Sequence, residues 1–229
     1  SSKDSDQNIG YAGRVFGNKT FTKNNWKGTP SFEYQHINSR FHILDRINDV
    51  EFSRDFNLAQ EFNQITQNRF IFSFLNQWNN ASFLNYKINY LDEKNSYTGI
   101  KNDLDFGWIK GKLNTRGNFS YLDTKAVFQD TKFVRSGIIS EYSTKKGSWA
   151  IGGSMEHNVK NFNETNQLDV TSFSWREVFI QKKLSDSSRT KLLTRMYFRD
   201  NDSVRNNSLE NMNHILGIMA ESPIIKTEK

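Results

Sequence analysis

The sequence predicts an all-β protein: an antiparallel up-and-down meander of about 10–12 long strands, forming a transmembrane β-barrel or a segment of a larger one. Two observations support this prediction. Several strand-like segments alternate apolar and polar side chains with a period of two. Between the segments, short joints alternate with long polar ones, as in barrels that have tight periplasmic turns and longer extracellular loops.

Eleven strands are expected in chain order. They cover residues 10–20, 28–44, 69–76, 81–91, 97–107, 110–122, 131–144, 148–160, 168–183, 189–200 and 212–222. Several exceed the five or six residues that are usual in soluble sheets. A tilted strand needs about 9–11 residues to cross the hydrocarbon of a bilayer, so these lengths favour a membrane barrel.

The alternation is clear in residues 81–91, where one face carries Leu84, Tyr86, Ile88 and Tyr90 and the other Asn85, Lys87 and Asn89. Residues 168–183 interrupt the pattern, because Glu177 shares a face with Phe173, Trp175 and Phe179. A carboxylate facing lipid in mid-bilayer is costly. Glu177 is therefore expected near a membrane boundary, or on a face that meets protein.

The joints fall into two predicted classes. The short joints lie near 76–80, 107–111, 145–148 and 184–189, and the long ones at 45–68, 92–97, 123–131, 160–167 and 200–211. Long loops usually carry function or are disordered. We therefore expect partner-facing loops at Asp45–Asn68, with Arg54 and Asp55, and at Asp200–Asn211, with Asp200, Asp202 and Arg205.

Composition agrees with a sheet that has one apolar and one wet face. Hydrophobic residues make up 35%, mean hydropathy is -0.75, and aromatic residues reach 14%, too many for a disordered chain. No run approaches the roughly 20 apolar residues of a membrane helix. Residues 1–8 are expected to be a disordered polar lead-in, and residues 9–229 a single barrel-like domain.

Charge and cysteine content narrow the function classes. The net charge is +6, but Lys and Arg are dispersed and no binding motif accompanies them, so nucleic acid is not an expected partner. The chain has no Cys, which excludes disulfides and thiolate metal sites. The four His are dispersed without ligand spacing, and neither a metal nor another cofactor is expected.

Asp103 and Asp105 are the candidate catalytic pair. At i, i+2 on one strand face their carboxyl groups would lie about 6–7 Å apart, within the range that glycosidases use. In a barrel they would instead line a polar lumen, opposite Lys or Arg on a neighbouring strand. The lumen is the favoured interpretation. The chain also carries no phosphate loop and no nucleophile elbow.

Four tryptophans lie at or beside the predicted short joints. They are Trp26, Trp78, Trp108 and Trp149. This is where an interfacial aromatic girdle lies in a membrane barrel. Stacking on sugars is the alternative use, and the gathering at one end of successive hairpins favours the girdle. Outer-membrane lipid is thus an expected partner.

The stretch Val50-Glu51-Phe52-Ser53-Arg54-Asp55-Phe56-Asn57-Leu58, followed by a meander of long amphipathic strands, resembles the large Asn/Lys/Phe-rich outer-membrane β-barrel proteins of Bacteroidota. The resemblance implies a barrel in the bacterial outer membrane. Such barrels usually end in a terminal aromatic, whereas this sequence ends Ile224-Ile225-Lys226-Thr227-Glu228-Lys229, and eleven strands is an odd number. A segment of a larger barrel, or one missed strand, is therefore expected.

Three functions follow in order of preference. The first is an outer-membrane barrel, or part of one, with a transport or surface-scaffold role and no catalysis, meeting other envelope proteins or glycans. The second is a soluble secreted or periplasmic β-sheet module that binds glycan or protein. The third is an all-β glycoside hydrolase that uses carboxylates such as Asp103 and Asp105.

Overall fold

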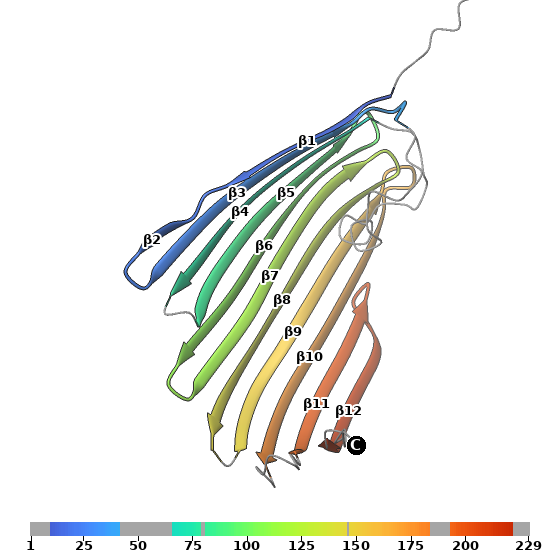
Figure 1. The fold of residues 1–229 in the computed structure, drawn as a ribbon. Coiled ribbons are helices and arrows are strands. Elements are labelled where there is room, and N and C mark those ends of the chain that lie inside the picture. Colours follow the sequence, from blue (N-terminus) through green and yellow to red (C-terminus); the bar gives the residue numbers. More distant parts are fainter. Residues whose placement is uncertain (1–9, 42–65, 79–80, 146, 184–192, 222–229) are drawn as a thin grey trace, which may run out of the picture.

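The computed structural model of the chain describes residues 10–41, 66–78, 81–145, 147–183 and 193–221. All the strands of these residues belong to one antiparallel sheet (Figure 1). They are β1 (Ala12–Asn18), β2 (Phe21–Lys23), β3 (Trp26–Ile37), β4 (Gln67–Trp78), β5 (Ser82–Glu93), β6 (Tyr97–Lys110), β7 (Leu113–Ala126), β8 (Gln129–Thr144), β9 (Gly147–Phe162), β10 (Gln167–Lys183), β11 (Leu193–Arg205) and β12 (Ser208–Glu221). None of the described residues belongs to a helix that is long and apolar enough to cross a membrane.

The sheet is an up-and-down meander, which confirms the predicted fold class. From β3 to β12 each strand pairs with the strands before and after it in the sequence, while β1 and β2 both pair with β3. Strands β3 to β12 are 12 to 17 residues long. The pairing ends at β1 on one side and at β12 on the other, and no pairing among the described residues joins these two strands.

Pro30 lies opposite the break between β1 and β2. The predicted strand 10–20 corresponds to β1, and β2 begins beyond its predicted end. β1 and β2 lie in line along β3 in one register, with Asn18 opposite Ser31 and Phe21 opposite Gly28. Between them the Lys19 N–H donates to the Pro30 carbonyl at 3.2 Å, but Pro30 has no N–H to donate in return. The missing N–H of Pro30 faces the outermost strands of the sheet, and sheets tolerate proline at such margins.

The predicted alternation of short and long joints is wrong. At the end of the sheet that holds the β5–β6, β7–β8, β9–β10 and β11–β12 joints (the upper end), the joints are only residues 94–96, 127–128, 163–166 and 206–207. The β3–β4 joint, also at the upper end, is long, and residues 42–65 of it lie outside the described residues. The β2–β3, β4–β5, β6–β7, β8–β9 and β10–β11 joints form the lower end (Figure 1).

Asparagine adopts a left-handed conformation in three of the four short upper joints. Asn95, Asn166, Asn206 and Asn207 all have positive φ, a conformation that Asn tolerates better than most residues. At Asn206 and Asn207 the φ values are 47° and 65°, as a two-residue type I′ hairpin turn requires. The stretches 92–97, 123–131, 160–167 and 200–211, predicted as long loops, are therefore continuations of strands into tight turns.

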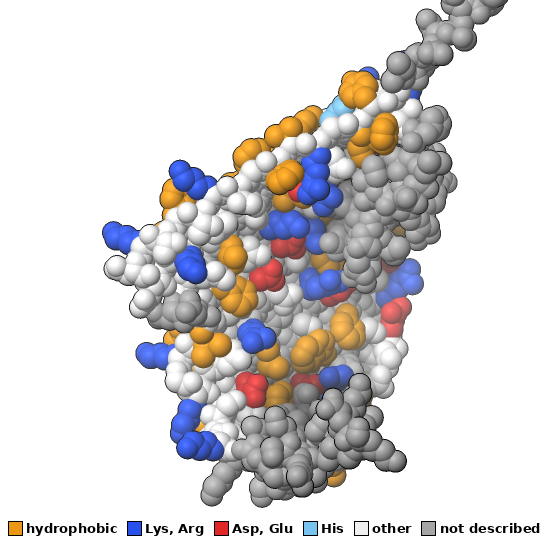
Figure 2. All heavy atoms as spheres, viewed as in Figure 1, with side chains coloured by type: hydrophobic (Ala, Val, Ile, Leu, Met, Phe, Trp, Pro, Cys, Tyr) orange, Lys and Arg blue, Asp and Glu red, His pale blue; other side chains and the backbone are white. Residues whose placement is uncertain are grey.

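The register divides the side chains into two faces. The apolar face carries Phe32, Tyr34, Phe70, Phe72, Phe74, Leu84, Tyr86, Ile88, Leu104, Phe106, Phe119, Ile138, Ile151, Val178, Ile180, Met196, Phe198, Leu216 and Ile218. The polar face carries Glu33, Lys87, Lys101, Asp103, Asp105, Arg116, Asn118, Arg135, Glu156, Asn158, Glu177, Arg199, Asn201 and Arg205. In Figure 2, acidic and basic side chains intermingle over the middle of the sheet.

Little of the apolar surface is buried within the described residues. The one buried apolar cluster among them, Leu91, Tyr97 and Leu122, lies on the polar face near the upper end, with Ala126 and Phe133 packed against it. By contrast, many side chains of the apolar face are more than a third exposed. A contiguous apolar surface of this extent marks contact with a partner or with lipid.

Candidate functional site

The four predicted girdle tryptophans all lie on the apolar face, near the lower end. Trp26 pairs with Trp78 across β3 and β4, and its indole Nε1 donates to Asn76 Oδ1 at 3.3 Å. Trp78, Trp108 and Trp149 are 39%, 47% and 53% exposed. The four side chains thus mark one margin of the apolar face, while their contact with a membrane interface stays a prediction.

A second margin, here called the polar border, limits the apolar face toward the upper end. Its side chains come from successive strands. They are His36 on β3, Asn68 on β4, Asp92 on β5, Asp123 on β7, Lys132 on β8, His157 on β9, Ser172, Ser174 and Arg176 on β10, Asp200 and Asp202 on β11, and His214 on β12. Above the border, apolar side chains such as Val204 and Met212 occur among polar ones.

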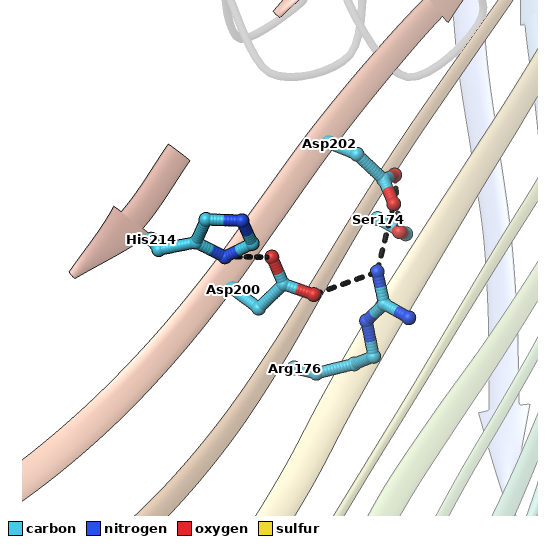
Figure 3. Close-up of polar contacts among 5 residues, drawn as sticks. All are labelled: Ser174, Arg176, Asp200, Asp202 and His214. Carbon is cyan, nitrogen blue, oxygen red and sulfur yellow. Dashed lines mark hydrogen bonds and ion pairs between the residues drawn. The ribbon is translucent and has the colours of Figure 1, made fainter. Parts of the chain in front are cut away.

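The border is most highly charged where β10, β11 and β12 run side by side (Figure 3). Arg176 Nη2 lies 2.8 Å from a carboxylate oxygen of Asp200 and 2.8 Å from one of Asp202. Ser174 donates to Asp202 at 2.5 Å, and His214 Nδ1 lies 2.9 Å from Asp200. Five polar side chains from three strands thus form one connected cluster on a face that is otherwise apolar.

The polar border does not follow the register. It lies at Asn68 on β4 and at His214 on β12. The register row of His214 passes through Asp200, Arg176, Gly153, Ile138, Gly117, Phe106 and Leu84 and reaches β4 at Asn76. Asn76 is eight residues from Asn68, and β12 is eight strand-to-strand steps from β4. Between β4 and β12 the border therefore moves by one residue per strand on average.

This slope defines an angle between the strands and the border. One residue is about 3.3 Å along a strand, and neighbouring strands lie about 4.8 Å apart. If an axis is drawn perpendicular to the border, the strands tilt from this axis by about 35°. The Trp margin moves in the same direction but less, since Trp26, Trp78 and Trp108 share one register row and Trp149 on β9 lies two residues below it.

The two margins enclose an apolar band of nearly constant height. Ten residues separate Asn68 from Trp78 on β4, and eight separate His157 from Trp149 on β9. At about 3.3 Å per residue and a tilt of about 35°, these intervals correspond to roughly 27 Å and 22 Å along the axis. The band is thus bounded by polar side chains above and by tryptophans below.

Register rows on the polar face contain side chains of both charges. One register row runs across five strands through Lys87, Asp103, Ser120, Arg135 and Glu156. Within it Ser120 donates to Asp103 at 2.6 Å, and Arg135 Nε and Nη2 donate to Glu156 Oε2 at 3.1 and 3.0 Å. Charged pairs of this kind make the face wettable without a large excess of either sign.

Asp103 and Asp105, the candidate catalytic pair, lie on this polar face in mid-strand. Asp103 is opposite Lys87 in the register and 3.6 Å from Lys101 Nζ. Asp105 is opposite Asn85 on one side and Asn118 on the other. The pair therefore lies among cations and amides of neighbouring strands, an arrangement that fits a wet wall.

Glu177 also lies on the polar face, where its side chain is only 5% exposed. Arg199 Nε donates to Glu177 Oε2 at 2.8 Å, and the guanidinium lies 5.6 Å from the centre of the Trp175 ring. The aromatic residues of β10 that share this face therefore pack beside a paired carboxylate. The sequence predicts Glu177 near a membrane boundary or on a face that meets protein. The structure instead places it, together with Phe173, Trp175 and Phe179, on the polar face.

The predicted partner-facing loop at Asp200–Asn211 is wrong as a loop. Asp200, Asp202 and Arg205 lie within β11, because Asn206 and Asn207 close a tight turn to β12. Asp200 and Asp202 belong to the polar border, and Arg205 pairs with Asp169 on the polar face at 2.9 Å. Arg54 and Asp55, in the other predicted loop, lie outside the described residues, as does the lead-in 1–8.

Sequence reasoning missed the cluster of Ser174, Arg176 and His214 with the two aspartates. The stretch from Arg199 to Arg205 has one apolar residue, Val204, and no apolar–polar alternation. The local signal that it is a strand is the adjacent pair Asn206 and Asn207, which predicts a tight turn after it. In the described part of the chain, no group of three or more His, Cys, Asp or Glu side chains is arranged to hold a metal ion.

Comparison with family models, with curated proteins and with solved structures found no match to this chain. The class of protein therefore has to be argued from the sheet itself.

Proposed function

We propose that the chain forms the wall, or part of the wall, of a bacterial outer-membrane β-barrel with a transport or surface-scaffold role and no catalysis. The observation that carries the proposal is the sloping apolar band. A membrane imposes two parallel planes on a protein, so its margins must cut across tilted strands at a constant angle. The upper margin of the band, from Asn68 on β4 to His214 on β12, crosses the strands in this way, and the four tryptophans mark its lower margin.

The dimensions of the band support the same proposal. Strands of outer-membrane barrels tilt by about 35–45° and present an apolar belt about 25 Å tall between aromatic girdles. The slope of one residue per strand corresponds to about 35°, and the two strand intervals to roughly 22–27 Å.

The polar face supports a wet interior on the other side of the wall. In barrels of this kind, lumen-facing side chains alternate with lipid-facing ones and are polar. Rows such as Lys87, Asp103 and Arg135 supply both charges, and the interior would accept polar solutes without selecting strongly for one sign. Asn118 and Asn201 add neutral hydrogen-bonding groups.

Fractionation tests this proposal. The chain expressed with an export signal should partition with the outer membrane, and it should migrate differently in unheated and boiled samples on a detergent gel. Quantitative recovery in the soluble fraction without detergent contradicts the proposal and favours a glycan- or protein-binding module, which a glycan array then examines. Hydrolytic activity that is lost in both Asp103→Asn and Asp105→Asn would favour the enzyme instead.

A further inference from the structure

The hairpin that joins β2 to β3 carries a cavity at the lower margin of the apolar band. The cavity has a volume of about 330 Å³ and is lined by Lys23, Asn24, Asn25, Trp26 and Trp78. Lys23 is opposite Trp26, and Trp26 is opposite Trp78, so an ammonium group and two indoles stand in one register row on the same face. Asn24 enters the turn with φ of 52°.

The lining groups divide by chemistry. Two indole rings supply an amphipathic surface, and Trp is enriched where a membrane meets water. Lys23 and the side-chain amides of Asn24 and Asn25 are exposed hydrogen-bond donors on the side away from the band. Among the described residues no carboxylate forms an ion pair with Lys23. The cavity thus presents donors and a positive charge directly beside an aromatic surface.

The whole lower end of the sheet is positively charged, as the cavity is. Exposed lysines lie at or near its joints on several strands, and they are Lys19, Lys23, Lys27, Lys110, Lys112 and Lys145. Among the described residues within four positions of these joints, the only carboxylate is that of Glu141. On the side shown in Figure 2, the left-hand edge, where the lower ends of β2 and β3 and of β6 and β7 lie, carries Lys and Arg side chains but no Asp or Glu.

The upper end differs. Asp92, Glu93, Asp123 and Asp130 lie there among lysines such as Lys125, so both signs are present. A basic rim at only one end selects a negatively charged surface at that end. Lysines near an anionic bilayer each strengthen binding several-fold, and their stems allow the ammonium group to reach the headgroup level.

We propose that the Lys23–Trp78 cavity binds the phosphate of an anionic phospholipid headgroup, with the two indoles against the glycerol and ester region. This inference rests on the proposed membrane function. It adds a lipid class and an orientation: the lower end lies in the leaflet that holds the anionic phospholipid, and Lys23 with the Asn24 and Asn25 amides contacts the phosphate. Lys110, Lys112 and Lys145 extend the same contact around the rim.

Native mass spectrometry of the detergent-solubilised protein tests the site. With phosphatidylglycerol added, the wild-type protein should retain this lipid in preference to phosphatidylcholine. Lys23→Gln should reduce the retained fraction about fivefold, as expected for one lysine at an anionic surface. Lys125→Gln, which changes another exposed lysine of the apolar face at the upper end, is the matched control and should leave retention unchanged.

Several outcomes overturn the inference. Equal retention of the two lipids, or equal effects of Lys23→Gln and Lys125→Gln, removes the anionic site. Loss of retention in Trp78→Ala without an effect of Lys23→Gln removes the phosphate contact, and displacement by millimolar inorganic phosphate assigns the cavity to a free anion. A protein that remains heat-modifiable while failing these tests still satisfies the proposed barrel, whereas a protein that needs no detergent fails the barrel itself.

Discussion

Glu177 on β10 and Arg199 on β11 are register partners, and both Nε and Nη2 of Arg199 donate to a single carboxylate oxygen of Glu177. Arg199 also lies over the rings of Trp175 and Tyr197, at 5.6 and 5.9 Å from their centres. The carboxylate is therefore held on the polar face among aromatic side chains. Because Glu177 is buried, its pairing with Arg199 should contribute more to stability than the exposed ion pairs of the same face.

Glu177→Ala should lower the free energy of unfolding by about 2 kcal/mol. Removing one partner of a buried ion pair costs about 3–5 kcal/mol, and the partial exposure of Arg199 reduces that cost. Glu156→Ala is the matched control, because Arg135 makes the same two-point contact from beside Phe133 and is as exposed as Arg199, whereas Glu156 is 36% exposed against 5% for Glu177. The control should cost less than about 1 kcal/mol. Urea titration in lipid vesicles measures both, and equal losses contradict the account.

Phe119→Arg and Asn118→Arg test whether the apolar face of the sheet, and not the polar face, contacts lipid. The two residues are adjacent on β7 and both exposed, but Phe119 belongs to the apolar face and Asn118 to the polar face. An arginine at the bilayer midplane costs about 2–4 kcal/mol on the lipid face of a barrel. Phe119→Arg should therefore destabilise the protein in vesicles by this amount, with Asn118→Arg nearly neutral. Similar unfolding midpoints for the two variants would argue against a lipid-facing apolar surface.

Asn207→Val tests the tight turn between β11 and β12. The left-handed conformation of Asn207 costs a β-branched residue about 1–2 kcal/mol, so the variant should unfold at correspondingly lower urea. Asn213→Val, on the polar face of β12 in extended conformation, is the control and should have little effect. A neutral Asn207→Val would mean that residues 206–207 belong to a tolerant loop.

The meander itself could be predicted from sequence, because period-two alternation over long segments is typical of strands with one apolar and one polar face. The predicted strands 81–91, 148–160 and 168–183 match β5, β9 and β10 to within three residues at each end. The prediction of loops from polar composition failed. Asp200 to Arg205 has loop-like composition, but alternate residues serve the polar face and the polar border, and Asn supplies the turn.

Less of the site than of the fold could be predicted from the sequence. The positions of the four tryptophans follow from local joints, and the structure places them on one face and at one end, as expected. The slope of the polar border depends on register between strands as distant as β4 and β12, which no single segment encodes. For the same reason the joining of Arg176, Asp200 and His214 into one cluster required the pairing of three strands.

The slope of the apolar band is the central claim, and paired spin labels test it directly. The chain has no Cys, so single cysteines can be introduced at Phe74 and Met212 for nitroxide labelling. The two residues share one register row, but Phe74 lies within the band on β4 and Met212 lies above the polar border on β12. Ile218, within the band on β12, provides the lipid-facing reference for that strand.

The measurement is the collision rate of each label with oxygen and with a water-soluble nickel chelate in lipid vesicles. The account predicts that labels at Phe74 and Ile218 favour oxygen, whereas the label at Met212 favours the aqueous chelate. Equal depths for Phe74 and Met212, or exposure of all three labels to the aqueous chelate, would contradict it.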